Sequence, residues 1–308
     1  MRRGSGASGA PLAGAQFVDP KVLARISTLE LLARTVVDGF ISGMHRAPNL
    51  GTSLDFAEHR PYMPGDDLRR MDWKLYARTD RHYLKLFEAD TNANLMVLMD
   101  ISKSMSFGME GISKLDYARY LAASLLYFSS RQRDRVGLAT FDSAIVDYVP
   151  ASARHLDVCL HTLHRTEAGK PGSLAAPLKV LGERFRRRGI VVLISDFYED
   201  ALSVVDAVKG LRYQGQDVIV FHVLDPAELD FPFQEASPFQ DLETGERIPV
   251  VPATLRDRYR ELVAEHIETL QTKFTGHRID YAQLNTGAPL DAALFRYLSA
   301  RERMSRVR

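Results

Sequence analysis

Two short apolar runs, each ending in an aspartate, constrain the fold of this chain more than any other feature. Residues 94–100 read Asn-Leu-Met-Val-Leu-Met-Asp, and residues 190–196 read Ile-Val-Val-Leu-Ile-Ser-Asp. Apolar runs of this length are typical of strands that are buried on both faces of a parallel sheet. Each strand would therefore carry its aspartate to the carboxyl edge of the sheet, where ligands bind in open α/β folds.

Helical periodicity and further apolar runs alternate along the rest of the chain. Strands are expected at 136–141, 144–149, 217–224 and 278–284, and helices at 113–133, 155–165, 174–187, 200–212, 253–274 and 289–302. This alternation predicts an α/β fold with a doubly wound, mostly parallel sheet and helices on both faces. Strand 144–149 is expected to be the antiparallel exception, because a tight turn at Asp142-Ser143 joins it to the preceding strand.

The N-terminal part of the chain does not follow this alternation of strands and helices. Residues 1–16 are expected to form a disordered tail, and residues 17–92 an N-terminal helix, predicted as one long helix over 19–44, with a β-rich extension that includes a short helix carrying Trp73. The α/β domain would then occupy 93–304, with a hairpin insertion near 236–251 that turns at Thr244-Gly245. The segment Gly65-Asp66-Asp67 is open to two interpretations, packing against nearby arginines or contact with a partner.

Composition excludes several classes of protein. The chain has 40 Lys and Arg residues against 39 Asp and Glu, a net charge of +1, so a general attraction to nucleic acid or anionic membrane is not expected. Its single cysteine, Cys159, allows no internal disulfide and fits a reducing compartment. No uninterrupted apolar segment of about 20 residues is present to span a bilayer. We therefore expect a cytoplasmic protein without direct membrane insertion.

Oxygen-bearing side chains gather at the ends of the two acid-ended strands. Asp100 is followed by Ser102 and Ser104, Asp196 ends the second strand, and Ser173 follows a glycine-containing loop at 166–172. If the two strands are neighbours, these side chains converge and can surround one hard cation. Mg²⁺ suits such a set best, because it takes oxygen ligands and keeps several waters; Mn²⁺ and Ca²⁺ are alternatives. One coordination position of the cation would remain open, and an acidic side chain of a partner could fill it.

Two motifs carry a family resemblance. The pattern Asp100-x-Ser102-x-Ser104 at a strand end, with Ser195-Asp196 on a later strand, resembles the metal-ion-dependent adhesion site of von Willebrand factor A domains. The run Tyr62-Met-Pro-Gly-Asp-Asp-Leu-Arg-Arg-Met-Asp-Trp73, with Ala77-Arg78 and Lys85-x-Phe-Glu88, resembles the signature of the domain of unknown function 58 family. Together the two resemblances cover roughly residues 20–300.

The resemblance implies a von Willebrand factor A-like domain whose relatives often work beside MoxR-type AAA+ ATPases, as adaptors or in chaperone-like assembly. It also implies metal-site roles for Asp100, Ser102, Ser104 and Asp196. For Ser173 two roles stay open, metal ligation and capping of the helix that begins near Leu174.

The function expected from these features is a non-enzymatic, metal-dependent protein-interaction module that binds an acidic side chain through Mg²⁺. The alternative is a magnesium-dependent phosphohydrolase with Asp100 as nucleophile. Against this alternative, Ser102 stands where haloacid-dehalogenase-like phosphatases place a second acid, and no phosphate-binding glycine-rich loop is present.

Overall fold

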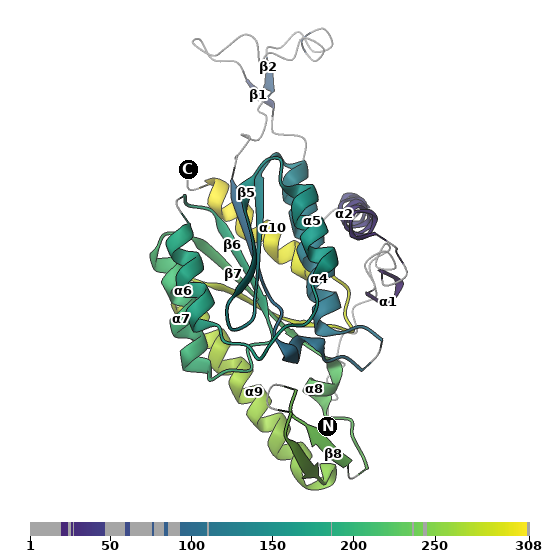
Figure 1. The fold of residues 1–308 in the computed structure, drawn as a ribbon. Helices are drawn as coiled ribbons and strands as arrows, with labels where there is room; N and C mark the ends of the chain where they lie inside the picture. The colour runs from purple at the N-terminus through teal and green to yellow at the C-terminus, as the bar shows by residue number, and fades with distance from the viewer. Residues whose placement is uncertain are drawn as a thin grey trace, which may run out of the picture.

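A six-stranded sheet forms the centre of the protein (Figure 1). The computed structural model describes residues 20–23, 26, 28–46, 59–61, 76, 83–85, 93–109, 111–185, 187–235, 237–242 and 245–306. The sheet strands are β3 (Asn94–Asp100), β4 (Arg135–Phe141), β5 (Ile145–Ser152), β6 (Ile190–Ser195), β7 (Asp217–Leu224) and β10 (Asp280–Asn285), in the order β10-β7-β6-β3-β4-β5. Strand β5 runs antiparallel to β4, and the other neighbours pair in parallel.

Helices cover both faces of the sheet (Figure 1). Helices α4 (Lys114–Arg131), α5 (Leu156–Arg165) and α10 (Asp291–Arg306) pack on one face, and α6 (Ala175–Arg184), α7 (Ala201–Tyr213) and α9 (Pro252–Gly276) pack on the other. Strand β3 supplies both cores, because successive side chains of a strand point to opposite faces: Leu95 and Val97 enter the first core, and Met96 and Leu98 the second. The predicted doubly wound α/β architecture is therefore confirmed, including the antiparallel β5.

The sequence signals for helix α4 act as expected. The Ser113 side chain accepts a hydrogen bond from the Asp116 backbone N–H, and the Asp116 side chain accepts one from the Ser113 backbone N–H. This capping box satisfies two backbone groups that a helix start otherwise leaves without partners. It fixes the first turn of α4, and with it Lys114, at the carboxyl edge of the sheet.

The prediction of one long N-terminal helix is wrong. The structure has a short helix α1 (Pro20–Leu23) and a separate helix α2 (Leu29–Arg46). The interruption falls at Thr28, whose hydroxyl accepts a hydrogen bond from the Leu31 backbone N–H and so starts a new helix. Helix α2 packs against α4, and the Arg131 guanidinium lies 2.6 Å from the Asp38 carboxylate.

Little of the predicted extension lies within the described residues. Strands β1 (His59–Pro61) and β2 (Tyr83–Lys85) pair antiparallel. The tail at 1–16 and the Gly65-Asp66-Asp67 segment lie outside the described residues, as does the expected helix around Trp73 apart from Tyr76, which is helical. The domain boundaries stay predictions.

The predicted hairpin insertion is present between β7 and α9. Strands β8 (Ser237–Gln240) and β9 (Arg247–Val250) pair antiparallel, and Gly245 adopts a positive φ of 77° beside the turn. The helix α8 (Pro226–Asp230) that precedes the hairpin and the short 3₁₀ helix η3 (Lys103–Ser106) were not predicted from the sequence. In the described part of the chain, no helix combines the length and the apolar character that crossing a bilayer requires.

A buried glycine on β4, next to the edge strand β5, gives a test of the packing. A Cβ on Gly137 of β4 would lie 2.7 Å from the Ala151 backbone nitrogen and 2.8 Å from the Val149 carbonyl oxygen. We expect Gly137→Ala to lower the free energy of unfolding by about 1–3 kcal/mol, measured by urea denaturation, because the paired backbone of β5 must shift.

Gly210 of α7 is the matched control, because a Cβ there meets no atom within 4 Å. Gly210→Ala should raise the free energy of unfolding by about 0.5–1 kcal/mol, since alanine loses less backbone entropy in a helix. Equal effects of the two substitutions would contradict the packing described here.

Candidate functional site

The two acid-ended strands are neighbours. Strand β3 pairs in parallel with β6, with Met99 opposite Ile194, so Asp100 and Ser195 emerge side by side. The Ser195 hydroxyl donates a 2.6 Å hydrogen bond to Asp100 Oδ2. The connections from these two strands cross opposite faces of the sheet, through α4 and α7. The cluster therefore occupies the switch point at which open α/β sheets bind ligands.

Ser102 and Ser104 form a hydroxyl pair beside Asp100. Their Oγ atoms lie 3.1 Å apart, and the Ser102 backbone N–H donates a 2.8 Å hydrogen bond to Asp100 Oδ1. Ser102 occupies the N-cap position of η3, but its side chain makes no capping hydrogen bond. Helix capping therefore does not account for the placement of this hydroxyl.

The loop at 166–173 closes tightly over Ser102. A Cβ on Gly172 would lie 2.6 Å from the Ser102 Cβ, so the loop backbone can approach this closely at a glycine. The buried Asp142 anchors the loop, because its Oδ2 accepts a 3.1 Å hydrogen bond from the Lys170 backbone N–H. The sequence pattern indicates only a turn at Asp142 and gives no signal for this contact with the loop.

Ser173 lies at the end of this loop. Its backbone N–H donates a 3.3 Å hydrogen bond to the Asp142 carbonyl oxygen. The N-cap position of α6 is Leu174 rather than Ser173, and Glu199 Oε1 accepts a 2.6 Å hydrogen bond from the Leu174 backbone N–H. The loop that carries Ser173 thus borders the hydroxyl pair, and a capping role for Ser173 loses its support.

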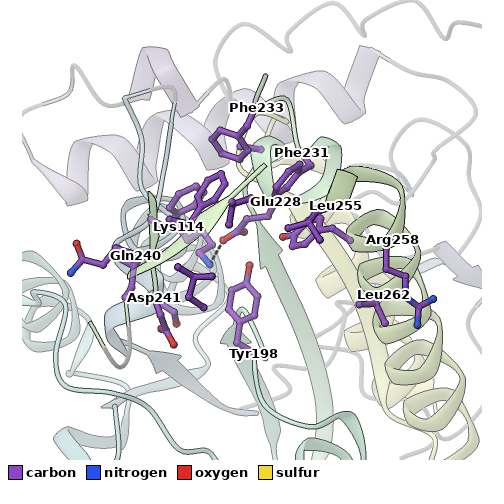
Figure 2. Close-up of a pocket in the computed structure, with 18 residues that line it drawn as sticks. Lys114, Tyr198, Glu228, Phe231, Phe233, Gln240, Asp241, Leu255, Arg258 and Leu262 are labelled. Atoms are coloured by element: carbon purple, nitrogen blue, oxygen red, sulfur yellow. Dashed lines mark hydrogen bonds and ion pairs between the residues drawn. The ribbon is translucent and has the colours of Figure 1, made fainter. Parts of the chain in front are cut away.

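Asp196 is held by a lysine that the sequence did not indicate. Lys114 Nζ lies 2.6 Å from Asp196 Oδ2 and 2.7 Å from Glu228 Oε1, and the lysine side chain is fully buried (Figure 2 shows the contact with Glu228). The ammonium also lies 4.5 Å from the centre of the Tyr198 ring, in cation–π geometry. Burial alone would lower the pKa of Lys114, but the two carboxylates raise it above its ordinary value.

Only part of this ion-pair cluster had a signal in the sequence. Asp225-Pro-Ala-Glu228 is a capping box with proline at the first helical position, so the start of α8 could have been found. Lys114 could not, because a lysine in the first turn of an amphipathic helix is normally exposed and its partners lie 82 and 114 residues away.

Electrostatics favour a cation beside Asp100. Burial, and then the nearby Asp196 carboxylate, raise the pKa of Asp100 to about 7, while hydrogen bonds from Ser195 and Ser102 oppose the rise. Ionised Asp100 is therefore costly unless positive charge lies close by. Asp100, Ser102 and Ser104 fit a magnesium site in their chemistry; Asp196 fits less directly, because Lys114 already neutralises part of its charge.

A histidine on the face of the sheet that α6, α7 and α9 cover fixes the Asp196 backbone. His222 Nε2 donates a 2.9 Å hydrogen bond to the Asp196 carbonyl oxygen, and His222 Nδ1 accepts one of 2.7 Å from the Tyr281 hydroxyl. Burial and the neighbouring His266 lower the pKa of His222 to about 3. Within the described residues, no group of three or more His, Cys, Asp and Glu side chains is arranged to hold a metal.

Fold and site together define an α/β protein with an oxygen-rich cluster at the switch point of its sheet. The chain belongs to the family described as "Protein of unknown function DUF58", which matches residues 58–269.

Uncharacterized proteins of Mycobacterium bovis and Mycobacterium tuberculosis are 31% identical to it over 294 residues, which cover 92% of this chain and 91% of each relative. Similar solved structures include BatB from Bacteroides thetaiotaomicron, with a TM-score of 0.46, 15% identity and coverage of 68% of this chain and 96% of that one. An aerotolerance-related membrane protein from Bacteroides fragilis has a TM-score of 0.49, 18% identity and coverage of 67% and 98%.

The buried ion pairs predict a large effect of removing the lysine charge. Lys114→Met keeps much of the side-chain volume but leaves Asp196 and Glu228 buried without their cation. The free energy of unfolding at pH 7 should fall by about 3–5 kcal/mol in urea denaturation.

Lys209→Met is the control, because its ion pair with Asp206 lies at the surface and should leave stability nearly unchanged. Adding Glu228→Gln to Lys114→Met should restore part of the loss. Equal stability of the Lys114 and Lys209 variants would contradict the role assigned to Lys114.

Proposed function

We propose that this chain is a non-catalytic, metal-dependent protein-interaction module. In this proposal Asp100, Ser102, Ser104 and Ser173 supply oxygen to Mg²⁺ directly or through water, and Asp196 contributes through water. The open coordination position takes a carboxylate from an acidic side chain of a protein partner. The metal would thus act as a bridge between two proteins.

The observation that carries the proposal is the hydroxyl pair of Ser102 and Ser104. Both side chains are buried at the carboxyl edge of the sheet, 3.1 Å apart, beside an aspartate whose ionised form needs a cation. Neutral hydroxyl ligands leave much of a divalent charge uncompensated, which favours an additional anionic ligand from outside.

The Lys114 ion pairs favour a binding role for the site over a catalytic role. They hold Asp196 in place and balance part of its charge, so Asp196 is better suited to fixing a metal-bound water than to direct ligation. Both carboxylate oxygens of Asp100 accept hydrogen bonds, from Ser102 and Ser195. No specific observation favours the alternative in which Asp100 is the nucleophile of a phosphohydrolase.

The proposed partner is a MoxR-type AAA+ ATPase or one of its client proteins. This step rests on the resemblance of the sequence motifs, together with membership of the DUF58 family. We further propose a cytoplasmic location, which the single, buried Cys159 supports.

The first test uses Mg²⁺ alone. At a concentration 100 times its dissociation constant, Mg²⁺ should raise the free energy of unfolding of the wild-type protein by about 2.7 kcal/mol relative to EDTA. Asp100→Asn should abolish this increase without loss of stability in EDTA, because it removes a buried charge. Ser102→Ala and Ser104→Ala should weaken metal binding in titration calorimetry.

Glu183→Gln, an exposed substitution on α6, serves as the control and should leave the magnesium effect intact. If Mg²⁺, Mn²⁺ and Ca²⁺ all fail to bind the wild-type protein, the metal site proposed here is wrong.

A second test addresses the partner. A purified MoxR-type ATPase from the same organism should bind the wild-type protein at least tenfold more tightly than the Asp100→Asn variant, measured by biolayer interferometry at one fixed Mg²⁺ concentration. Holding Mg²⁺ constant matters because the ATPase needs it for nucleotide. Equal affinity of the two forms would refute a metal bridge to this partner.

A further inference from the structure

A groove opens directly beside the candidate metal site. It has a volume of about 840 Å³ and lies between the end of the sheet, helix α8, the β8–β9 hairpin and the N-terminal half of α9 (Figure 2). Ser104, Lys114, Tyr198 and Glu228 line its inner end. Because Ser104 belongs to both, the groove and the hydroxyl pair form one continuous surface.

Aromatic side chains pack against one another in the outer wall of the groove. The rings of Phe231 and Tyr259 have centroids 4.7 Å apart, and those of Phe233 and Phe239 are 4.9 Å apart. The Arg256 guanidinium also donates a 2.6 Å hydrogen bond to the Phe233 carbonyl oxygen, which ties α9 to the segment before the hairpin. These contacts join α8, the described part of the hairpin and α9 into one wall of the groove.

The rim of the groove is apolar and accessible. Ile248 of β9 and Leu255 and Leu262 of α9 are each 45–53% exposed, although all three line the groove. Large apolar side chains gathered around one groove mark a binding surface, since scattered exposed residues need no explanation but contiguous ones do. An occupant must therefore offer apolar surface of its own.

The charges around the groove favour a protein segment over a membrane. Its charged residues are Lys114 and Arg258 against Glu228 and Asp241, an even balance that lacks the basic excess by which proteins bind anionic lipid. At the inner end, the Lys114 ammonium is already paired with Glu228 and with Asp196, which is not part of the groove lining, so a bound divalent cation must supply the positive charge that a carboxylate needs there. The groove and the cation site are thus matched to a ligand that is both apolar and acidic.

We propose that this groove binds a protein segment in which a bulky apolar side chain lies close to an acidic one. The carboxylate reaches the cation at Ser104, and the apolar side chain enters the groove between the hairpin and α9. The inference rests on the function proposed above and adds to it the chemistry of the partner. Specificity then comes from the insertion, while the metal supplies a carboxylate contact common to many ligands.

The experiment selects peptides from a random twelve-residue display library on the full chain in Mg²⁺, then measures synthetic copies by fluorescence anisotropy. Enriched peptides should combine Asp or Glu with a nearby Leu, Ile, Phe or Met. Exchange of the acid for its amide, or of the apolar residue for serine, should each weaken binding about tenfold or more.

Variants of the protein separate the two halves of the site. The double variant Leu255→Ser and Leu262→Ser should weaken peptide binding about tenfold or more, yet bind Mg²⁺ as the wild type does. Val146→Ser on β5 is the matched control, because Val146 is equally exposed, at 53%, but lies on the edge strand of the sheet. It should leave peptide affinity unchanged.

Each remaining outcome has a defined meaning. If selected peptides need Mg²⁺ but bind the double variant like the wild type, the groove inference fails and the proposed function stands. If peptides bind through the groove equally well in EDTA, the metal bridge fails, and with it the combined site inferred here. Failure to enrich any peptide also overturns the inference. So does binding of the wild-type protein to phosphatidylglycerol vesicles, if the double variant no longer binds them.

Discussion

The burial of the Lys114 ammonium between two carboxylates is the interaction on which the carboxyl edge of this protein depends. It joins the first turn of α4, the end of β6 and helix α8, three elements that the sequence separates by many residues. A buried charge is tolerated only when its partners are fixed, so all three elements are held in one arrangement. Asp196 consequently reaches the cluster at Asp100 already oriented and partly neutralised.

A lysine inside such a cluster changes the electrostatic design of the site. A cation site made only of acids is strongly repulsive when the metal is absent. Here Lys114 supplies permanent positive charge on one side, and serine hydroxyls replace carboxylates on the other. Burial and the neighbouring Asp196 carboxylate raise the pKa of Asp100 to about 7.

Features encoded locally could be predicted from the sequence, and features made by distant contacts could not. The acid-ended apolar runs located β3, β6 and the convergence of Asp100 with Asp196, and the capping box at Ser113 located α4. The hydroxyl pair followed from its spacing behind Asp100. The ion-pair cluster depends on the packing of α4, the end of β6 and α8, and the groove depends on the packing of α8, the hairpin and α9. The sequence of each element carries no local signal that identifies these distant partners. The break before α2 was missed because a single capping threonine outweighed the helical spacing around it.

Helix α9 extends from the hairpin beside the groove to the strand end that carries Asp196. Its 25 residues span about 37 Å, and only its C-terminal half, through Leu270 and Phe274, is anchored in the core, while its N-terminal half extends to the hairpin (Figure 1). Between the two halves, His266 donates a 3.0 Å hydrogen bond to the carbonyl oxygen of Phe197, the residue after Asp196. Helix α9 therefore connects the hairpin wall of the groove to the backbone that follows Asp196.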